Sequence, residues 1–389
     1  MIFLVSPSAH YPSHNWPNTV ALARALLRQG RTVQLITFSS TTDAIPPDLQ
    51  GKVTAVYQRL PSAWRKVASG QWQSRRWGGL MNVTETLTCL FRALRLSRRQ
   101  PDAALHFIGG SYWVVVVATL WFRRRFVYSL YGGLLAGPAS GAKALLRIFL
   151  RWLLRRAVGT DRLDFTCENE LLRAEISALV GPHVRLIPYA IDDEEKPVSQ
   201  AAARQRLGLP LDEKIILFFG THRREKDYLT PLKGCLTLPT PPLALFVGKV
   251  ISENDPRQAV AACAYPKASI VNEFVAEEMT KYYFAAADAL VLSYEANFSR
   301  GSGVLIECCR YFRPMIASAT PYFSAFLAQY PCGVTYTPGE SASFAAAAQR
   351  LLADTSVFQA ALERARRDHS WSSAADKYLE LYGKGGAVT

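Results

Sequence analysis

The sequence has 389 residues, of which 49% are hydrophobic and 20% are charged. This composition excludes a disordered chain, and the length suffices for two domains. Its seven cysteines include no CxxC pair, which argues against a zinc site or a disulfide framework and favours a reducing compartment. The longest apolar run, residues 112–122, is too short to span a bilayer, and the chain start lacks the basic segment of a secretory signal. We therefore expect a protein that is cytoplasmic or sits on a cytoplasmic membrane face.

Positive charge is concentrated in the first half of the chain. Residues 1–190 contain 24 Lys and Arg against 9 Asp and Glu, a net charge of +15, whereas residues 191–389 contain 21 against 22. Two halves of such different charge indicate two domains with different partners. The basic half is expected to meet an anionic partner, and a membrane surface, a nucleic acid and an acidic polymer are the candidates.

The chain opens with the pattern of a βαβ unit. Residues 2–5 predict a strand, 18–27 a helix and 33–37 a second strand. The loop before the helix follows the carboxyl end of a strand, where open α/β sheets bind ligands, but it lacks a GxGxxG dinucleotide fingerprint. His14 and Asn18 are candidates for an acceptor cleft, and a role as loop caps is an equal alternative for each.

Two further strands, 104–108 and 126–130, precede a helix at 143–156 of distinctive composition. Basic residues recur on it every four positions, and Leu, Ile, Phe and Trp fill nearly all the places between them. Such a helix can lie in a membrane interface with its cations on anionic lipid; a core helix with arginines along one edge is the competing interpretation. Nucleic acid is disfavoured because the arginines alternate with apolar residues. The expected membrane contacts are Lys143, Arg147, Arg151, Trp152 and Arg155.

An acidic stretch at 191–200 follows a strand at 184–188 and is expected to link two domains. The α/β pattern then begins again, which predicts a second sheet of buried parallel strands. Its expected elements are strands at 214–219, 243–247 and 269–271, and a helix at 277–287.

A glycine-bearing loop, 299–303, joins a strand at 289–292 to a helix at 304–312, and a strand at 315–318 comes next. Such a loop directs backbone N–H groups and the positive end of a helix dipole at one place, which suits a phosphate. A simple turn without a ligand is the alternative. The basic loop 221–226, after an earlier strand, is a second place where phosphate can be neutralised.

The second half also contains motifs in a characteristic order. They are Gly220 to Lys226, Asn272 to Val275, the helix end at Asp288, Ser302 to Leu305 with Glu307, Pro314 to Ser318, and the Trp371-Ser372 helix. In this order, most of residues 180–380 resembles a retaining glycosyltransferase of family 4. The resemblance implies the GT-B fold, an α/β architecture of two Rossmann-like domains with parallel sheets facing across a cleft. The implied parts are an acceptor-binding domain, 1–190, a nucleotide-sugar-binding domain, 191–365, and a helix, 366–389, that crosses back to the first domain.

The resemblance also assigns roles to residues. It implies that Arg223 and Lys226 hold the donor's diphosphate and stabilise the charge that grows on it as the glycosidic bond breaks. It implies that Glu307 accepts hydrogen bonds from both ribose hydroxyls, and an unpaired acid in an apolar helix is otherwise costly. The remaining implied contacts to the nucleotide sugar are Phe274 and Val275 at the base, and Ser302, Gly303, Val304 and Leu305 at the phosphate.

Two positions depart from the family pattern. Ser299 stands where the family has the first of two catalytic glutamates, and Glu295 lies four residues earlier. Tyr131 stands where a histidine often follows a strand of the first domain. Both departures concern the sugar side of the site, so Glu295 and Tyr131 join the candidates for the acceptor or the cleft.

The resulting expectation is a glycosyltransferase that uses a nucleotide-diphosphate sugar and retains the anomeric configuration. Its acceptor would be lipid-linked or a polysaccharide, in cell-surface glycan biosynthesis, and its place the cytoplasmic face of the inner membrane. No metal is expected, since Arg223 and Lys226 would take a metal's role. No nucleic acid is expected as a partner either. A non-catalytic subunit that binds nucleotide or glycan and positions an enzyme is the alternative, and a phosphorylase of the same fold is a third possibility.

Overall fold

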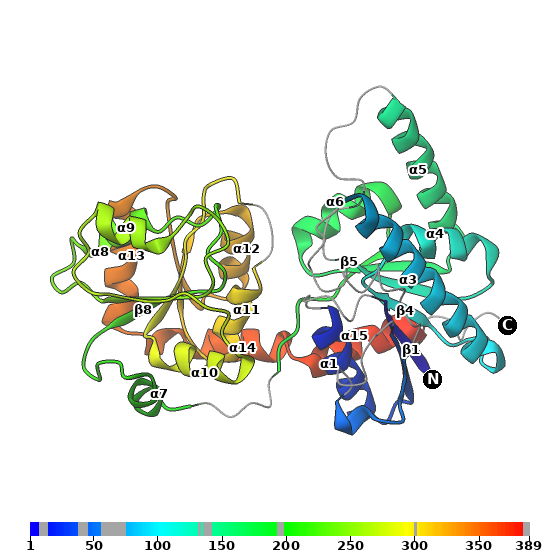
Figure 1. The fold of residues 1–389 in the computed structure, drawn as a ribbon, viewed down its shortest axis with the longest axis horizontal. Coiled ribbons are helices and arrows are strands. Elements are labelled where there is room, and N and C mark those ends of the chain that lie inside the picture. Colours follow the sequence, from blue (N-terminus) through cyan, green and yellow to red (C-terminus); the bar gives the residue numbers. More distant parts are fainter. Residues whose placement is uncertain are drawn as a thin grey trace. The chain divides into compact units, whose positions relative to one another are not determined.

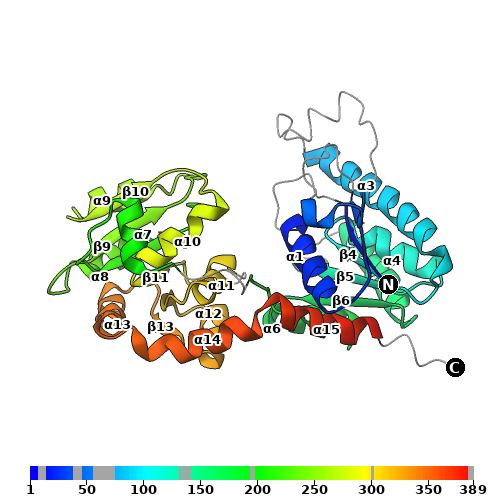
Figure 2. The ribbon, with the colours of Figure 1, turned by 90° about the horizontal axis from the view of Figure 1, so that it is seen from below.

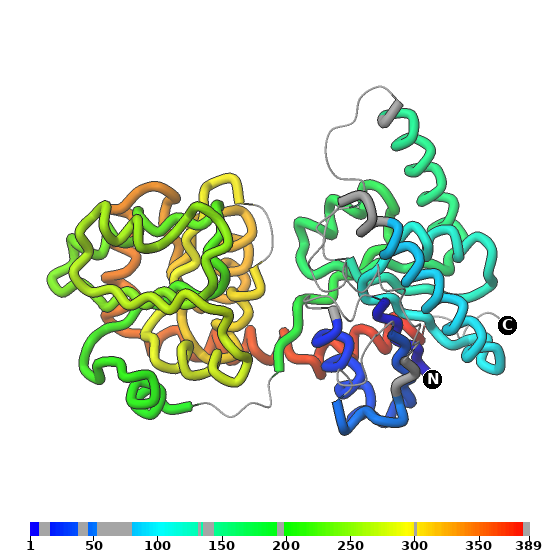
Figure 3. Tube along the Cα trace, in the orientation of Figure 1, coloured from blue at the N-terminus to red at the C-terminus, as the bar shows by residue number. Residues whose placement is uncertain are grey.

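The computed structural model describes residues 1–7, 15–37, 46–55, 75–130, 134, 142–192, 198–298 and 302–383 (Figure 3). Three of the candidate residues, His14, Tyr131 and Ser299, lie outside this part of the chain, and so does the side chain of Lys143. The chain divides into two compact units. Unit 1 comprises Met1–Ala190 with Trp371–Thr389, and unit 2 comprises Ile191–Ser370.

Unit 1 is built on a parallel sheet of seven strands in the order β3-β2-β1-β4-β5-β6-β7 (Figure 1). Because a parallel strand between two helical layers is buried on both faces, β1, β4 and β5 are apolar almost throughout. The strands are β1 (Ile2–Ser6), β2 (Val33–Thr37), β3 (Val53–Ala55), β4 (Leu105–Ile108), β5 (Phe126–Leu130), β6 (Leu163–Cys167) and β7 (Val184–Leu186).

Helices cover both faces of this sheet. One face packs against α3 (Arg75–Leu96), α4 (Tyr112–Trp121), α5 (Ala142–Val158) and α6 (Glu170–Val180) in a continuous hydrophobic cluster. The opposite face packs against α1 (Asn15–Arg28) and α15 (Trp371–Gly383), which lie side by side (Figures 1 and 2). In the part of the chain that the structure describes, no helix is both long and apolar enough to cross a membrane.

The last helix, α15, is fixed to unit 1 by a buried polar network. The ring of His106 on β4 pairs with the Tyr382 hydroxyl at 2.7 Å and with the Ser129 hydroxyl at 2.8 Å. Burial lowers the pKa of His106 to about 3, so the ring is neutral at physiological pH. Residues 366–370, which we expected to belong with the final helix, lie in unit 2, and the chain returns to unit 1 at Trp371.

Unit 2 contains a parallel sheet of six strands in the order β10-β9-β8-β11-β12-β13. Its strands are β8 (Ile215–Phe219), β9 (Leu243–Val247), β10 (Ala268–Val271), β11 (Ala289–Leu292), β12 (Met315–Ser318) and β13 (Gly333–Tyr336). Its helices are α7 (Gln200–Leu207), α8 (Leu229–Cys235), α9 (Pro256–Ala262), α10 (Glu277–Ala286), α11 (Gly303–Arg310), α12 (Pro321–Gln329), α13 (Ser341–Ala353) and α14 (Gln359–Asp368).

A buried ion pair fixes the two central strands of unit 2. Asp288, directly before β11, accepts from Nη2 of Arg204 at 2.8 Å and from the backbone amide of Ile215 at 2.8 Å. Both side chains of the pair are nearly buried, so removing either one would leave an uncompensated charge. The pair aligns the starts of β8 and β11, and thereby sets how their carboxyl ends meet at the opposite edge.

Candidate functional site

The loop that follows β8 returns to the carboxyl end of its own strand. It starts at Gly220, whose φ of +86° lies in the left-handed region that favours glycine. Lys226 ends the loop, and its Nζ donates hydrogen bonds to the carbonyl oxygens of Phe219, at 2.8 Å, and Gly220, at 3.3 Å. The ammonium group is therefore fixed at the end of the strand.

Two other segments approach this loop closely. A Cβ atom on Gly220 would lie 3.3 Å from Cγ2 of Val304, in the first turn of α11, and 3.8 Å from Nζ of Lys226. A Cβ atom on Gly248, directly after β9, would overlap the carbonyl oxygen of Gly220. Glycine at these two positions thus allows the ends of β8 and β9, the first turn of α11 and the Lys226 ammonium to meet.

The surroundings of Lys226 make its charge labile. Burial of the ammonium group lowers its pKa to about 7, and the nearby Arg223 guanidinium lowers the pKa further while Glu225 opposes the shift. Near neutral pH the group is therefore only partly protonated in the unliganded protein. A bound anion would stabilise the charged form, so this corner of unit 2 favours a negatively charged ligand.

Contacts from two neighbouring loops hold the basic loop in shape. Nδ2 of Asn254 donates to the carbonyl oxygens of Arg223, at 2.9 Å, and Lys226, at 2.5 Å. The amide of Glu295, after β11, donates to the carbonyl oxygen of Glu225 at 3.0 Å. These contacts fix the position of Lys226 before any ligand binds, which is the preorganisation that electrostatic catalysis requires.

Arg223 and His222 are neighbours in the loop but differ in exposure. The Arg223 side chain is exposed, and its Nε donates to the Thr221 hydroxyl at 3.0 Å. His222 is buried, with Nδ1 at 2.6 Å from the Tyr228 hydroxyl, and burial lowers its pKa to about 4. His222 is thus a neutral structural residue, whereas Arg223 is able to reach a ligand in solvent.

The start of α11 presents free backbone donors. Ser302 precedes the helix in an extended conformation, and its side chain makes no capping hydrogen bond. The amide of Leu305 donates to the carbonyl oxygen of Ser302 at 3.1 Å, so Leu305 is less available to a phosphate than we expected. Within the described residues, no acceptor engages the amides of Gly303 and Val304, which are left to bind an anion at the positive end of the helix.

Glu307 lies on the second turn of the same helix. Its side chain is 23% exposed, and its Oε2 is 3.4 Å from Nη1 of Arg310. The neighbouring guanidinium keeps the carboxylate from being a lone buried charge, and the remaining exposure leaves it accessible to a polar ligand.

The other candidates of unit 2 follow strands on the two sides of β8 at the same edge of the sheet. Phe274 and Val275 follow β10, which is separated from β8 by β9, and the Phe274 side chain is 73% exposed. Glu295 follows β11 and its side chain is exposed. The structure therefore places Lys226 and the start of α11 together, and Phe274 at the outer end of the edge.

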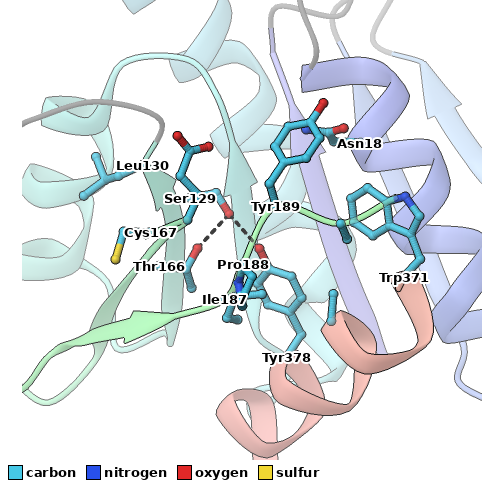
Figure 4. Close-up of a pocket in the computed structure, with 13 residues that line it drawn as sticks. Asn18, Ser129, Leu130, Thr166, Cys167, Ile187, Pro188, Tyr189, Trp371 and Tyr378 are labelled. Carbon is cyan, nitrogen blue, oxygen red and sulfur yellow. Dashed lines mark hydrogen bonds between the residues drawn. The ribbon is translucent and has the colours of Figure 1, made fainter. Parts of the chain in front are cut away.

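Unit 1 has a small cavity of about 30 Å³ where β5 and β6 end (Figure 4). Asn18 of α1 is part of its lining, as are Thr166 and Cys167 at the end of β6. Glu168 also lines it, and burial raises the pKa of this carboxyl group. The sequence indicates Asn18 as a cleft residue but not Glu168, because it does not predict the strand that ends directly before Glu168.

The helix with the basic stripe, α5, is exposed along much of its length and projects from the rest of unit 1 in Figure 1. Arg151 and Arg155 are exposed, and Arg147 is half-buried. A core helix would bury its large apolar residues. The interpretation of α5 as a core helix is therefore wrong for the turns over residues 145–152. Between 54% and 71% of each of the following side chains is exposed: Leu145, Leu146, Ile148, Phe149 and Trp152.

Two curated proteins resemble parts of this sequence, and no family model matches it. A D-inositol 3-phosphate glycosyltransferase of Nocardiopsis dassonvillei is 28% identical over 250 residues, 59% of this chain and 56% of that protein. A putative teichuronic acid biosynthesis glycosyltransferase, TuaC, of Bacillus subtilis is 28% identical over 171 residues, 42% of this chain and 40% of that protein. The chain thus spans about half the length of the curated relatives it matches.

Solved structures match the whole chain. The sucrose-phosphate synthase of Thermosynechococcus elongatus has a TM-score of 0.70 at 19% identity and covers 99% of both chains. HepE of Anabaena, in complex with UDP and glucose, has a TM-score of 0.65 at 16% identity and covers 99% of this chain and 100% of its own. The chain has a GT-B fold. Gly248 and Asn254 of this GT-B chain were not predicted as site residues, although a glycine directly after a predicted strand is a usable signal.

Proposed function

We propose that this GT-B protein is a glycosyltransferase that moves a sugar from a nucleoside diphosphate sugar to a lipid-linked or polysaccharide acceptor. The transfer retains the anomeric configuration and serves the synthesis of cell-surface glycans. The two curated relatives are named as glycosyltransferases, and HepE is recorded with UDP and with UDP-glucose, which supports a nucleotide-sugar donor.

The observation that supports this proposal most strongly is the meeting of Lys226 with the start of α11. Nζ of Lys226 is hydrogen-bonded at the end of β8, and the first turn of α11 reaches the same glycine, Gly220. A diphosphate bound there would meet a lysine ammonium and the amides of Gly303 and Val304. When the bond between the anomeric carbon and the diphosphate oxygen breaks, its electron pair goes to the diphosphate, and these groups stabilise the charge.

The remaining donor contacts extend from this point. Glu307 is one turn farther along α11 and accepts the ribose hydroxyls, while Arg223 reaches the diphosphate from the solvent side. Phe274 and Val275, after β10, pack against the base. Lys226 and Arg223 supply the positive charge that a divalent ion provides in other transferases, so the reaction proceeds without a metal.

The acceptor side belongs to unit 1 and to a membrane. The exposed apolar residues of α5 and its arginines suit a helix that lies in the interface of an anionic bilayer, with Trp152 at headgroup level. In this proposal the protein works on the cytoplasmic face of the inner membrane. Asn18 and Glu168 line the cavity at the strand ends of unit 1 and are the candidate acceptor contacts.

Thermal stabilisation by nucleotides tests the donor site. A ligand at ~100 times its dissociation constant adds roughly 2.7 kcal/mol to the free energy of unfolding, which a melting curve resolves. We expect UDP or another nucleoside diphosphate to stabilise the parent protein. If no nucleoside diphosphate raises the melting temperature, the proposed donor site is wrong. If a nucleotide binds but no nucleotide sugar is consumed with any lipid or glycan acceptor, the protein is the non-catalytic subunit.

A further inference from the structure

A second hollow, apart from the candidate donor site, lies on the helical layer of unit 1 that α3, α4, α5 and α6 form. It has a volume of about 420 Å³ and is formed where α3 and α4 end. Its apolar lining comes from Phe91, Leu94 and Phe122, and its basic lining from Arg95, Arg98, Arg123 and Arg124.

Arg124 builds this hollow and fixes its shape. Its guanidinium donates to the carbonyl oxygens of Gln100, at 2.7 Å, and Ser97, at 2.8 Å, and thereby ties the segment after α4 to the segment after α3. Both carbonyl groups belong to the turn that follows α3, so the two helix ends are held together by one side chain.

The three other arginines of the hollow have no ion-pair partner among the residues that the structure describes. Arg95, Arg98 and Arg123 are exposed, and among the described residues no carboxylate forms an ion pair with any of them. The surrounding sequence explains this, because residues 75–160 contain 14 Lys and Arg but only two acids, Glu85 and Asp102. Three cations around one hollow repel each other unless an anion joins them.

The hollow also continues into an apolar surface. Phe91 is 60% exposed and Trp121, at the end of α4, is 80% exposed. Leu87 and Val117, on α3 and α4, are exposed as well. Since α4 packs against both α3 and α5, the three helices that carry these exposed apolar residues belong to the same helical layer of unit 1 (Figure 1).

We propose that this hollow binds one anionic phospholipid of a bilayer, with the phosphate on Arg95, Arg98 and Arg123 and the chain region against Phe91 and Phe122. The combination selects this occupant. A free phosphate or a nucleic acid backbone would use the arginines but leave the phenylalanines and Trp121 in water. An uncharged apolar partner would leave three cations unpaired, whereas an anionic lipid satisfies both.

Vesicle sedimentation of the full chain tests the proposal. The hollow variant combines Arg95→Gln, Arg98→Gln and Arg123→Gln and keeps Arg124, which supports the fold. The matched control removes the same charge from exposed positions of unit 2: Lys233→Gln, Arg350→Gln and Arg367→Gln. Both are compared with the parent on phosphatidylcholine vesicles with and without phosphatidylglycerol, after their melting temperatures are shown to match.

We expect the hollow variant to bind the anionic vesicles ~100-fold more weakly than the parent, since each of the three basic residues at such a surface contributes about a factor of five. The control should stay close to the parent. Equal losses in both variants would mean that only net charge matters, and would overturn the site.

A second variant, Phe91→Ala, tests the apolar half with the charges intact. Loss of one inserted aromatic ring should weaken vesicle binding by about tenfold. Binding equal to that of the parent would overturn the proposed contact with the chain region. If substitutions on α5 abolish binding and the hollow variant binds as the parent does, the hollow proposal fails while the proposed membrane contact of α5 stands.

Discussion

Positive charge differs in its surroundings between two regions of the molecule. One region is the carboxyl edge of the sheet in unit 2, and the other is the helical layer of unit 1 formed by α3, α4, α5 and α6. At the edge, one lysine is held by two carbonyl groups and its pKa falls to about 7, so its charge depends on what binds there. On the helical layer, exposed arginines stand beside exposed Leu, Phe and Trp. The first arrangement suits a ligand that must bind and leave, and the second suits a broad surface that attracts by charge and holds by apolar contact.

The largest expected effect concerns the basic residues of α5 in unit 1. Replacing Lys143, Arg147, Arg151 and Arg155 by Gln should cost about 4 kcal/mol of binding to anionic vesicles, at about 1 kcal/mol per cation. Sedimentation measures this, and UDP binding should not change. Added salt should weaken the parent's binding because surface attraction is screened over roughly 10 Å. Vesicle binding that is unaltered in the quadruple variant would remove α5 from the membrane contact.

The second effect concerns Lys226 at the carboxyl edge of the sheet in unit 2. Lys226→Ala should lower turnover of the nucleotide sugar by about 100-fold or more, roughly 3 kcal/mol, because it removes a preorganised cation from the leaving group. Vesicle binding serves as the internal control, and Lys233→Ala, an exposed lysine on α8, is the matched substitution. Unchanged turnover in Lys226→Ala would place the donor elsewhere.

A smaller effect tests how far the donor site extends along α11. Glu307→Gln should weaken the binding of a ribonucleotide by about 1.5–3 kcal/mol, because the ribose hydroxyls lose hydrogen bonds to a charged acceptor. The binding of the 2′-deoxy form should weaken much less, because it lacks one of these hydroxyls. Calorimetric titration of both nucleotides measures the difference. The same loss for both would make Glu307 a structural partner of Arg310.

The smallest expected effect is the pH dependence of nucleotide binding, which distinguishes the lysine of unit 2 from the arginines of unit 1. Lys226 must be protonated to hold a diphosphate, and the bound anion raises its pKa above the value of about 7 in the free protein. Nucleotide binding therefore takes up a proton, and the affinity should fall as the pH rises above 7, by at most ~1.4 kcal/mol per pH unit. Vesicle binding through arginines should stay constant over the same range, and a nucleotide affinity that is flat from pH 6 to 9 would contradict the assigned pKa.

The sequence predicted the strands that are apolar on both faces, and the structure confirms β9, β11 and β12 with the expected bounds. It missed β6, because Asp164 and Thr166 interrupt the apolar run. In the fold Asp164 pairs with Arg125 at 3.1 Å, and Thr166 is hydrogen-bonded to Ser129 at 2.9 Å, so polar residues are buried in pairs that no local pattern reveals.

The candidate site was predictable to a similar extent. The motif from Gly220 to Lys226 named the lysine, but its contact with two carbonyl oxygens depends on how the loop turns, which the sequence does not show. The exposure of α5 was likewise undecided, because a core helix and an interfacial helix share the same periodicity. Only the neighbours of the helix in the folded chain distinguish the two.

The position of α15 in unit 1 has a consequence for how the protein is made. A ribosome completes the strands of unit 1 and the whole of unit 2 before it releases α15, yet Ala374, Ala375, Tyr378 and Leu381 of that helix are buried against the sheet of unit 1. Until then, α1 covers this face of the unit 1 sheet by itself, and the part that α15 buries stays exposed. Unit 2 is therefore able to finish folding before the unit that precedes it, and nascent chains that stop at Ser370 should engage chaperones through unit 1.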